Sequence, residues 1–201
     1  VHLSEDHPGA GDPDYRDRRN EIAALALAWE PGTAAPHVVY TDAEQEVWRT
    51  VCRELAPKHE RLAIREFLEA KERLDLPSNG VPSLDLVSDR LRPLTGFHYA
   101  PAAGLVPLRE FYGSLSSRLF YSTQYVRHPA LPLYTPEPDI IHEVVGHGHL
   151  LATPTFSEMH RLTGEATHRL CEEENVSFLS RVFWFTVEFG VVVEDGELKA
   201  Y

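Results

Sequence analysis

The apolar residues of this chain recur mostly at helical spacing. Thr41 and Glu44 are placed as in a capping box, and Val47 and Val51 follow on one face of the helix that this box would begin. This helix is expected to end at Pro57, because proline lacks a backbone hydrogen-bond donor. Similar patterns predict further helices over residues 20–29, 58–74, 107–121, 139–148, 155–173 and 176–189.

Three segments lack this periodicity. Residues 1–20 contain two prolines and two glycines between 8 and 13 and are expected to form an extended arm. Residues 77–107 are interpreted as a loop with one small strand, and Gly196 as the start of a hairpin that the sequence does not complete. Together these patterns predict one mainly α domain over residues 1–201, with minor β structure.

Composition narrows the class of protein. A chain of 201 residues with 43% hydrophobic and 25% charged residues is typical of a single globular domain. Its net charge of −12 argues against nucleic acid or an anionic membrane as a partner. Only two cysteines are present, in no CxxC pair, and no apolar run approaches the roughly 20 residues that cross a bilayer. The polar start also lacks a signal-peptide pattern, so we expect a cytoplasmic protein.

Two histidines stand close together in the expected helix 139–148, which Asp139 is placed to cap. His142 and His147 are five residues apart, so on an ideal α-helix they point roughly 140° away from each other. Both can reach one metal ion only if the helix ends or is distorted between them, and Gly146 is suitably placed for that. Zinc peptidases need histidines four residues apart, so the run HEVVGH is one residue too long for that class.

A single carboxylate occurs in the apolar segment 178–189, which is expected to be buried. Glu188 would be costly there unless it is paired or bound to metal, and Arg181, two turns earlier, is its alternative partner. Trp184 should share its helical face and line the same cavity. Two imidazoles and one carboxylate hold iron(II) while leaving positions open, so this set predicts a non-haem iron oxygenase. The alternative without a metal is that His142 and His147 are helix residues that make ordinary hydrogen bonds. His149 is a weaker candidate ligand.

At this point the chain closely resembles the pterin-dependent aromatic amino acid hydroxylases. The matching pieces occur in the family's order across nearly the whole chain: Asp6-His7-Pro8-Gly9, Thr95-Gly96-Phe97, Ala103-Gly104-Leu105, Thr123-Gln124-Tyr125-Val126-Arg127-His128, Tyr134-Thr135-Pro136-Glu137-Pro138-Asp139, His142-Glu143-Val144-Val145-Gly146-His147 and 184–190. The resemblance implies a mostly helical catalytic domain, iron(II), a tetrahydropterin cosubstrate and molecular oxygen. It also makes His142, His147 and Glu188 the iron ligands.

The resemblance assigns substrate roles by position. Arg127 matches the arginine that binds the carboxylate of the amino acid, a task that suits its planar fork. Tyr134 and Thr135 match residues beside the substrate, although a Tyr-Thr-Pro loop can equally be structural. Trp184 favours a pocket for phenylalanine or tyrosine, because tryptophan hydroxylases usually have phenylalanine there.

Four residues match positions near the pterin. Phe111 matches an aromatic residue that stacks on the pterin ring, although its periodicity alone would place it in the core. Gly104 and Val106 fall in the loop whose backbone lies along the pterin edge. Glu143 matches a carboxylate near the pterin, and as a residue of the first helical turn it also suits the helix dipole.

The expected function is hydroxylation of L-phenylalanine to L-tyrosine. Two alternatives stay open: a zinc-dependent hydrolase with Glu143 as general base, and a catalytically inactive relative that binds amino acids. The chain departs from the family at Gly148 and His149, where an apolar residue and proline are usual, and at Phe183, where animal members commonly have tyrosine. It also stops at Tyr201, before a segment that adds pocket residues in the family, so we expect the catalytic domain to continue further.

Overall fold

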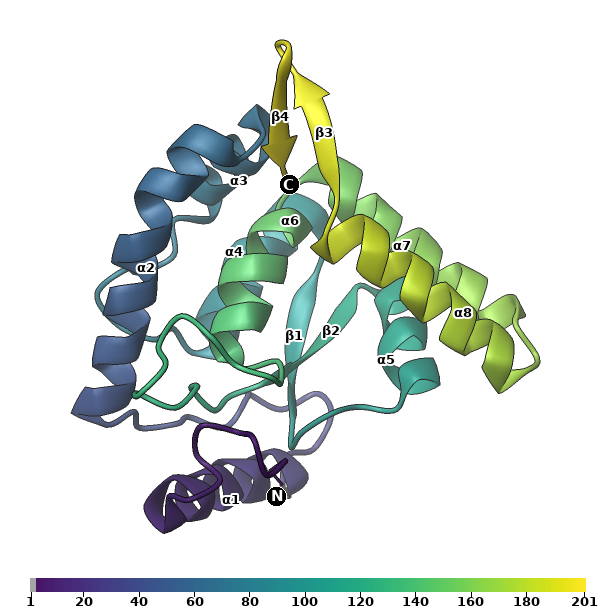
Figure 1. The fold of residues 1–201 in the computed structure, drawn as a ribbon. Helices are drawn as coiled ribbons and strands as arrows, with labels where there is room; N and C mark the ends of the chain where they lie inside the picture. The colour runs from purple at the N-terminus through teal and green to yellow at the C-terminus, as the bar shows by residue number, and fades with distance from the viewer. Residues whose placement is uncertain (1–2) are drawn as a thin grey trace.

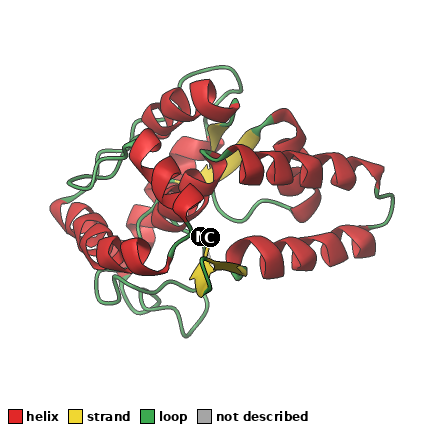
Figure 2. Cartoon of the chain, turned by 90° about the horizontal axis from the view of Figure 1, so that it is seen from above, coloured by secondary structure: helices red, strands yellow, loops and turns green. Residues whose placement is uncertain are grey.

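A computed structural model describes residues 3–201, and helices dominate it (Figures 1 and 2). The α-helices are α1 (Pro13–Leu27), α2 (Asp42–Leu62), α3 (Arg65–Leu74), α4 (Leu84–Thr95), α5 (Leu108–Ser114), α6 (His149–Leu151), α7 (Pro154–Arg169) and α8 (Glu173–Phe183). The other elements are the 3₁₀ turn η1 (Leu115–Ser117), the π-helices η2 (His142–Gly148) and η3 (Trp184–Glu188), and the strands β1 (His98–Ala102), β2 (Leu119–Thr123), β3 (Val191–Glu194) and β4 (Glu197–Ala200). The predicted mainly α class with minor β structure is confirmed.

The first helix begins earlier than expected. Asp12 accepts a hydrogen bond from the backbone amide of Tyr15, and Pro13 occupies the first helical position, where its missing N–H costs nothing. The extended arm predicted over residues 1–20 is therefore wrong from Pro13 onward, while residues 1–2 lie outside the described part. The pair Asp12-Pro13 is thus a helix start and not a turn.

Helix α2 passes through Pro57, so the predicted break there is wrong. The capping box of Thr41 and Glu44 is present, and Val47 and Val51 are buried on the core side of the helix. Pro57 lies on the exposed side, where water can reach the backbone carbonyl that it leaves without a partner. The helix predicted over 58–74 is accordingly divided between the end of α2 and α3.

Helix α4 occupies much of the segment interpreted as loop. Ser83 caps it by accepting from the amide of Leu86, and Leu84, Val87 and Leu91 bury one face completely. Its only proline, Pro93, falls in the last turn, so the preceding turns remain intact. The helical spacing of the three buried residues was therefore a stronger signal than the prolines.

The expected small strand is β1, and it pairs in parallel with β2, from His98 beside Leu119 to Ala102 beside Thr123. Strand β2 takes the end of the helix predicted over 107–121, because α5 stops at Ser114. The two strands lie behind the helix that η2 and α6 form, between this helix and the pair α7 and α8 (Figure 1).

The helix formed by η2 and α6 passes through the middle of the molecule (Figure 1). Its apolar residues Val144, Val145, Leu150 and Leu151 are all buried in the main core. Helix α2 covers one side, while α7 and α8 lie antiparallel on the other. The two candidate histidine ligands are thus carried by the most enclosed helix of the fold.

The segment 178–189 buries one face only. Phe183 and Val187 are 3% and 1% exposed, but Phe178, Phe185 and Phe189 are 62–66% exposed. The expectation that this apolar segment is buried all round is therefore wrong. Within residues 3–201, no helix is both long and apolar enough to cross a membrane.

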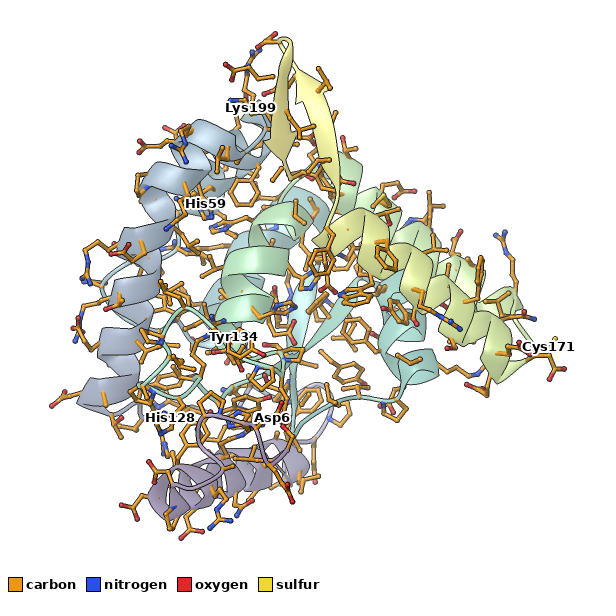
Figure 3. All side chains as sticks on the ribbon, in the orientation of Figure 1. Asp6, His59, His128, Tyr134, Cys171 and Lys199 are labelled. Carbon is orange, nitrogen blue, oxygen red and sulfur yellow. The ribbon has the colours of Figure 1, made fainter. Side chains whose placement is uncertain are left out.

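A complete C-terminal hairpin corrects another expectation. Strands β3 and β4 pair antiparallel across Asp195 and Gly196, which both adopt positive φ. Strand β4 reaches the junction of α2 and α3, where the amide of Ile64 donates to the carbonyl of Ala200 at 2.9 Å. Lys199, labelled in Figure 3, donates to the carbonyl of Arg61 at 2.7 Å, so the end of the chain is joined to its first third.

Candidate metal centre

The structure brings His142, His147 and Glu188 together. Their donor atoms lie within 4.8 Å of one another, and no other set of three potential ligands in residues 3–201 does so. The two Nε2 atoms of the histidines are 3.2 Å apart, and Nε2 of His147 is 3.9 Å from Oε1 of Glu188. The three donors can therefore face one ion.

A π-helix explains how histidines five residues apart face the same point. In η2 the backbone hydrogen bonds join residues five apart, so residue i+5 lies one turn above residue i. His142 and His147 occupy such positions, and the helix neither ends nor breaks at Gly146. The distortion that the sequence required is present, but it is spread over a whole helical turn.

A second π-helix carries the carboxylate. Glu188 is the last residue of η3, which continues α8 without a gap. Its side chain is 24% exposed, so it is less buried than expected. Arg181 does not pair with it, since this guanidinium donates to the backbone and hydroxyl oxygens of Ser177. The alternative partner proposed from the sequence is therefore absent.

Asp139 links the first histidine to Arg127. Its fully buried carboxylate accepts from the backbone amide of His142 at 3.0 Å and so caps the helix as predicted. It also accepts from Arg127 through Nε at 3.0 Å, through Nη2 at 2.7 Å and through the backbone amide at 2.8 Å. This second role of Asp139 was not foreseen, because nothing in the sequence separates a charge partner from an ordinary cap.

A cavity of about 700 Å³ has the three candidate ligands and Arg127 in its wall. Much of the remaining wall is apolar and includes Leu133, Val187 and Phe189. Nε and Nη2 of the Arg127 guanidinium donate to the carboxylate of Asp139, while its Nη1 makes no hydrogen bond within residues 3–201. The cavity therefore combines a metal-type donor set, one available cationic donor and apolar surface.

Burial sets the protonation of the donor set. Desolvation lowers the pKa of His142 and places that of His147 well below its usual value. Desolvation raises the pKa of Glu188, against a smaller lowering by a hydrogen bond from Trp184. Neutral imidazoles offer the lone pairs that a metal ion needs, and a bound cation would favour the ionised carboxylate. The site is electrostatically suited to a divalent ion.

The candidate His149 lies apart from the three donors. Its Nδ1 donates to the carbonyl of Val145 at 2.7 Å, and its ring packs edge-on against Phe67 and His59. Figure 3 places His59 between α2 and the helix that contains α6. A histidine in place of the family's usual proline thus serves packing and one backbone hydrogen bond.

Three of the four expected substrate residues do not line the cavity; Arg127 does. Tyr134 is 58% exposed on the loop before η2 (Figure 3), and the Thr135 hydroxyl donates to the carbonyl of Glu137. Trp184 is 45% exposed beside Glu188. Their contact with a substrate stays a prediction.

The expected pterin residues also lie outside the cavity wall. Gly104 and Val106 occupy the loop from β1 to α5, and Phe111 packs edge-on against Phe120 at 5.3 Å between ring centroids. Phe120 in turn lies 5.0 Å from the ring of His147. Burial and the charges of Asp139 and Glu188 hold the pKa of Glu143 well above its usual value. These pterin roles stay predictions.

The metal-free protein is expected to lose stability as the pH falls from 7 to 5. Folding lowers the pKa of seven described histidines, namely His7, His59, His98, His142, His147, His149 and His160. Between pH 7 and 5 the unfolded chain therefore binds more protons than the folded one, and acidification favours unfolding. For His160, whose pKa falls to about 4, the loss from pH 6.5 to 5 is about 2 kcal/mol. The raised pKa values of Glu143 and Glu188 act in the opposite direction but are fewer. Urea unfolding midpoints would check this, and a midpoint that rises on acidification would contradict it.

An open set of two imidazoles and one carboxylate is the donor arrangement that mononuclear iron enzymes of the facial-triad class use. The family model for the biopterin-dependent aromatic amino acid hydroxylases matches residues 1–201. The chain belongs to this family of enzymes, and the resemblance noted from the sequence is confirmed.

Relatives and solved structures agree with this assignment. Phenylalanine 3-hydroxylase of Streptomyces coeruleorubidus is 48% identical over 195 residues, which cover 97% of this chain and 70% of that one. Tyrosine 3-monooxygenase of Drosophila melanogaster is 45% identical over 206 residues, covering 99% of this chain and 35% of that one. Phenylalanine hydroxylase of Chromobacterium violaceum, solved with iron(III) and 7,8-dihydrobiopterin, has a TM-score of 0.83 at 28% identity over 94% of this chain and 69% of that one. Seven further curated relatives, the Drosophila enzyme among them, are matched over 35–56% of their length.

Proposed function

We propose that this domain hydroxylates the ring of free L-phenylalanine, with iron(II) and a tetrahydropterin as its cofactor and cosubstrate. The observation that carries the proposal is the convergence of His142, His147 and Glu188 in the wall of an apolar cavity that also contains Arg127. Iron(II) bound to these residues would, together with the reduced pterin, activate oxygen for insertion into the ring.

The residues of the chain would bind and orient the amino acid. Arg127 offers Nη1 to the substrate carboxylate, while Asp139 holds the rest of the guanidinium in place. The apolar wall, including Leu133 and Phe189, would surround the aromatic ring and limit the access of water. Asp139 also accepts from the backbone amide of His142, so the same carboxylate positions both the substrate-binding Arg127 and the helix that carries a metal ligand.

The experiment that tests this function is anaerobic loading with iron(II), followed by addition of phenylalanine, a tetrahydropterin and air. Chromatography that separates tyrosine from meta-tyrosine identifies the product. The tyrosine predicted from the sequence corresponds to the 4-position, whereas the Streptomyces relative is named for the 3-position. Either isomer supports the proposal, while the absence of both, with iron bound, contradicts it.

The two alternatives predict different outcomes in the same experiment. A hydrolase would be active with zinc and would need Glu143 beside the metal, but Glu143 is not among the residues lining the cavity. An inactive relative would bind phenylalanine without consuming oxygen. The family match favours neither, since its members are hydroxylases.

Substitution of Trp184 by phenylalanine is expected to narrow the preference for phenylalanine over tryptophan. The indole lies beside Glu188 but outside the cavity wall, so this prediction requires the ring of a bound substrate to extend as far as Trp184, where a bicyclic ring would need more room. A contact of this size is worth about 1–3 kcal/mol, so the relative kcat/KM should shift on the order of tens-fold and no more. Competition assays with both amino acids would measure it, with Phe178→Leu, at an exposed position of α8, as the control. An unchanged ratio would show that Trp184 does not select the ring.

We further propose a cytoplasmic setting with no nucleic-acid or membrane partner. Cys52 and Cys171 are both free in the structure, as a reducing compartment would allow. The net charge of −12 supports the absence of polyanionic partners.

A further inference from the structure

A histidine with no role in the proposed function lies behind the metal centre. His160, in α7, is fully buried, and its ring is packed among Phe97, Phe120 and Phe183 at centroid distances of 5.1–6.3 Å. The remaining ring beside it is that of His147, at 6.0 Å and nearly perpendicular. Of these neighbouring rings, only His147 carries polar atoms.

The hydrogen bond at Nδ1 fixes the tautomer of His160. This nitrogen lies 2.7 Å from the carbonyl oxygen of Phe156, which can only accept, so Nδ1 carries the proton. A second proton on Nε2 would place an unpaired charge among three phenyl rings, which is strongly unfavourable. Nε2 therefore presents a lone pair, and it is buried without a hydrogen-bond partner within residues 3–201.

His147 presents the complementary group. Its Nε2 faces His142 and Glu188, so a metal ion bound there would take the Nε2 lone pair and leave the proton on Nδ1. This Nδ1 is also buried and makes no hydrogen bond within the described residues. Two neighbouring rings thus each have a buried polar atom without a partner: the donor Nδ1 of His147 and the acceptor Nε2 of His160. Buried polar atoms are nearly always paired in folded proteins.

We propose that His160 is a positioning residue for the metal centre, whose Nε2 accepts the hydrogen bond from Nδ1 of His147. The inference rests on the proposed function insofar as it requires a metal ion at His147. A direct contact requires the two rings to approach more closely than their present 6.0 Å between centroids, because the two nitrogens make no hydrogen bond in the structure. The resulting chain runs from the carbonyl of Phe156 through His160 and His147 to the metal.

Such a contact fixes the orientation and tautomer of His147 and makes its Nε2 a better electron donor. Partners of this kind typically change metal affinity 10–100-fold when they are removed. The phenyl rings around His160 exclude competing water, so no solvent molecule from bulk can easily replace the lost acceptor. The affinity for iron(II) should therefore depend on a residue that does not touch the metal.

Two amide substitutions separate this role from packing. In His160→Gln the amide oxygen can take the place of Nε2, whereas in His160→Asn the shorter side chain reaches only the place of Nδ1. Both introduce a buried amide, so they are matched in polarity. His160→Leu removes both groups, and His168→Leu, further along α7 and bonded to Ser116, is the control.

The measurement is the dissociation constant for iron(II), obtained by anaerobic competition with a chromophoric chelator, together with the thermal midpoint of each metal-free variant. We expect His160→Asn and His160→Leu to bind iron about 10–100-fold more weakly, with His160→Gln and His168→Leu within about threefold of the parent. Equal affinity in all folded variants, or equal losses in the Gln and Asn variants, would overturn the proposal. If the Leu variant does not fold, the Gln and Asn pair decides. Failure of the parent itself to bind iron would instead contradict the proposed function.

Discussion

Substitution of Glu188 by alanine is expected to abolish iron-dependent hydroxylation while the domain remains folded. The variant leaves only the two histidines of η2, which cannot hold an ion as a three-donor set does. Removal of a direct ligand should weaken iron binding by more than the roughly 10–100-fold typical of residues behind a ligand. The Glu188 side chain is partly exposed and its pKa is raised by burial, so its loss should not destabilise the metal-free fold.

Iron content after loading and product formation would be measured on the same preparations. Glu174→Ala is the matched control, because Glu174 is an exposed carboxylate in the first turn of α8. Parent-like iron binding by the Glu188 variant, with an intact fold, would remove this residue from the metal site.

Substitution of Arg127 by lysine should raise the KM for phenylalanine by at least about thirty-fold. Loss of a charge-assisted contact in a buried site typically costs roughly 2–5 kcal/mol. Lysine retains the charge but cannot hold Asp139 with two nitrogens while offering a third to the substrate. Because Asp139 is fully buried, the metal-free variant should also be less stable by about 1–3 kcal/mol.

Steady-state kinetics and urea unfolding would separate the two effects. Arg161→Lys provides the control, since Arg161 forms its ion pairs with Glu158 and Glu165 within α7. An unchanged KM in the Arg127 variant would show that the substrate carboxylate is bound elsewhere. A raised KM with unchanged stability would show that lysine can replace the contact with Asp139.

The sequence predicted the donor set but not the helix geometry that brings it together. An ideal α-helix has 3.6 residues per turn, and at that spacing the side chains of His142 and His147 point in different directions. Val144 and Val145 within the π-helical turn of η2 are buried in the core, and a local sequence pattern does not reveal such tertiary packing. The need for a distortion could be predicted, whereas its form could not.

Proline and exposure account for the other differences. The break expected at Pro57 is absent because this residue lies on the solvent side of α2. Pro13 resembles a turn signal in the sequence, but after Asp12 it is a favourable first helical residue, and α1 therefore begins there. The apolar residues of α8 and η3 indicated a buried segment, but apolar composition does not show how much of a helix the rest of the chain covers.

The contact of β4 with the junction of α2 and α3 has a consequence for the order of folding. Lys199 and Arg61 are 138 positions apart in the sequence, yet their contact and the neighbouring pair Ile64 and Ala200 bring together two segments of the cavity wall that are distant along the chain. Closing such a long loop is entropically costly, so contacts of this range form late unless earlier packing has already brought their ends together. The central helix and its neighbours can pack first, and the cavity then acquires its full wall as one of the last events of folding.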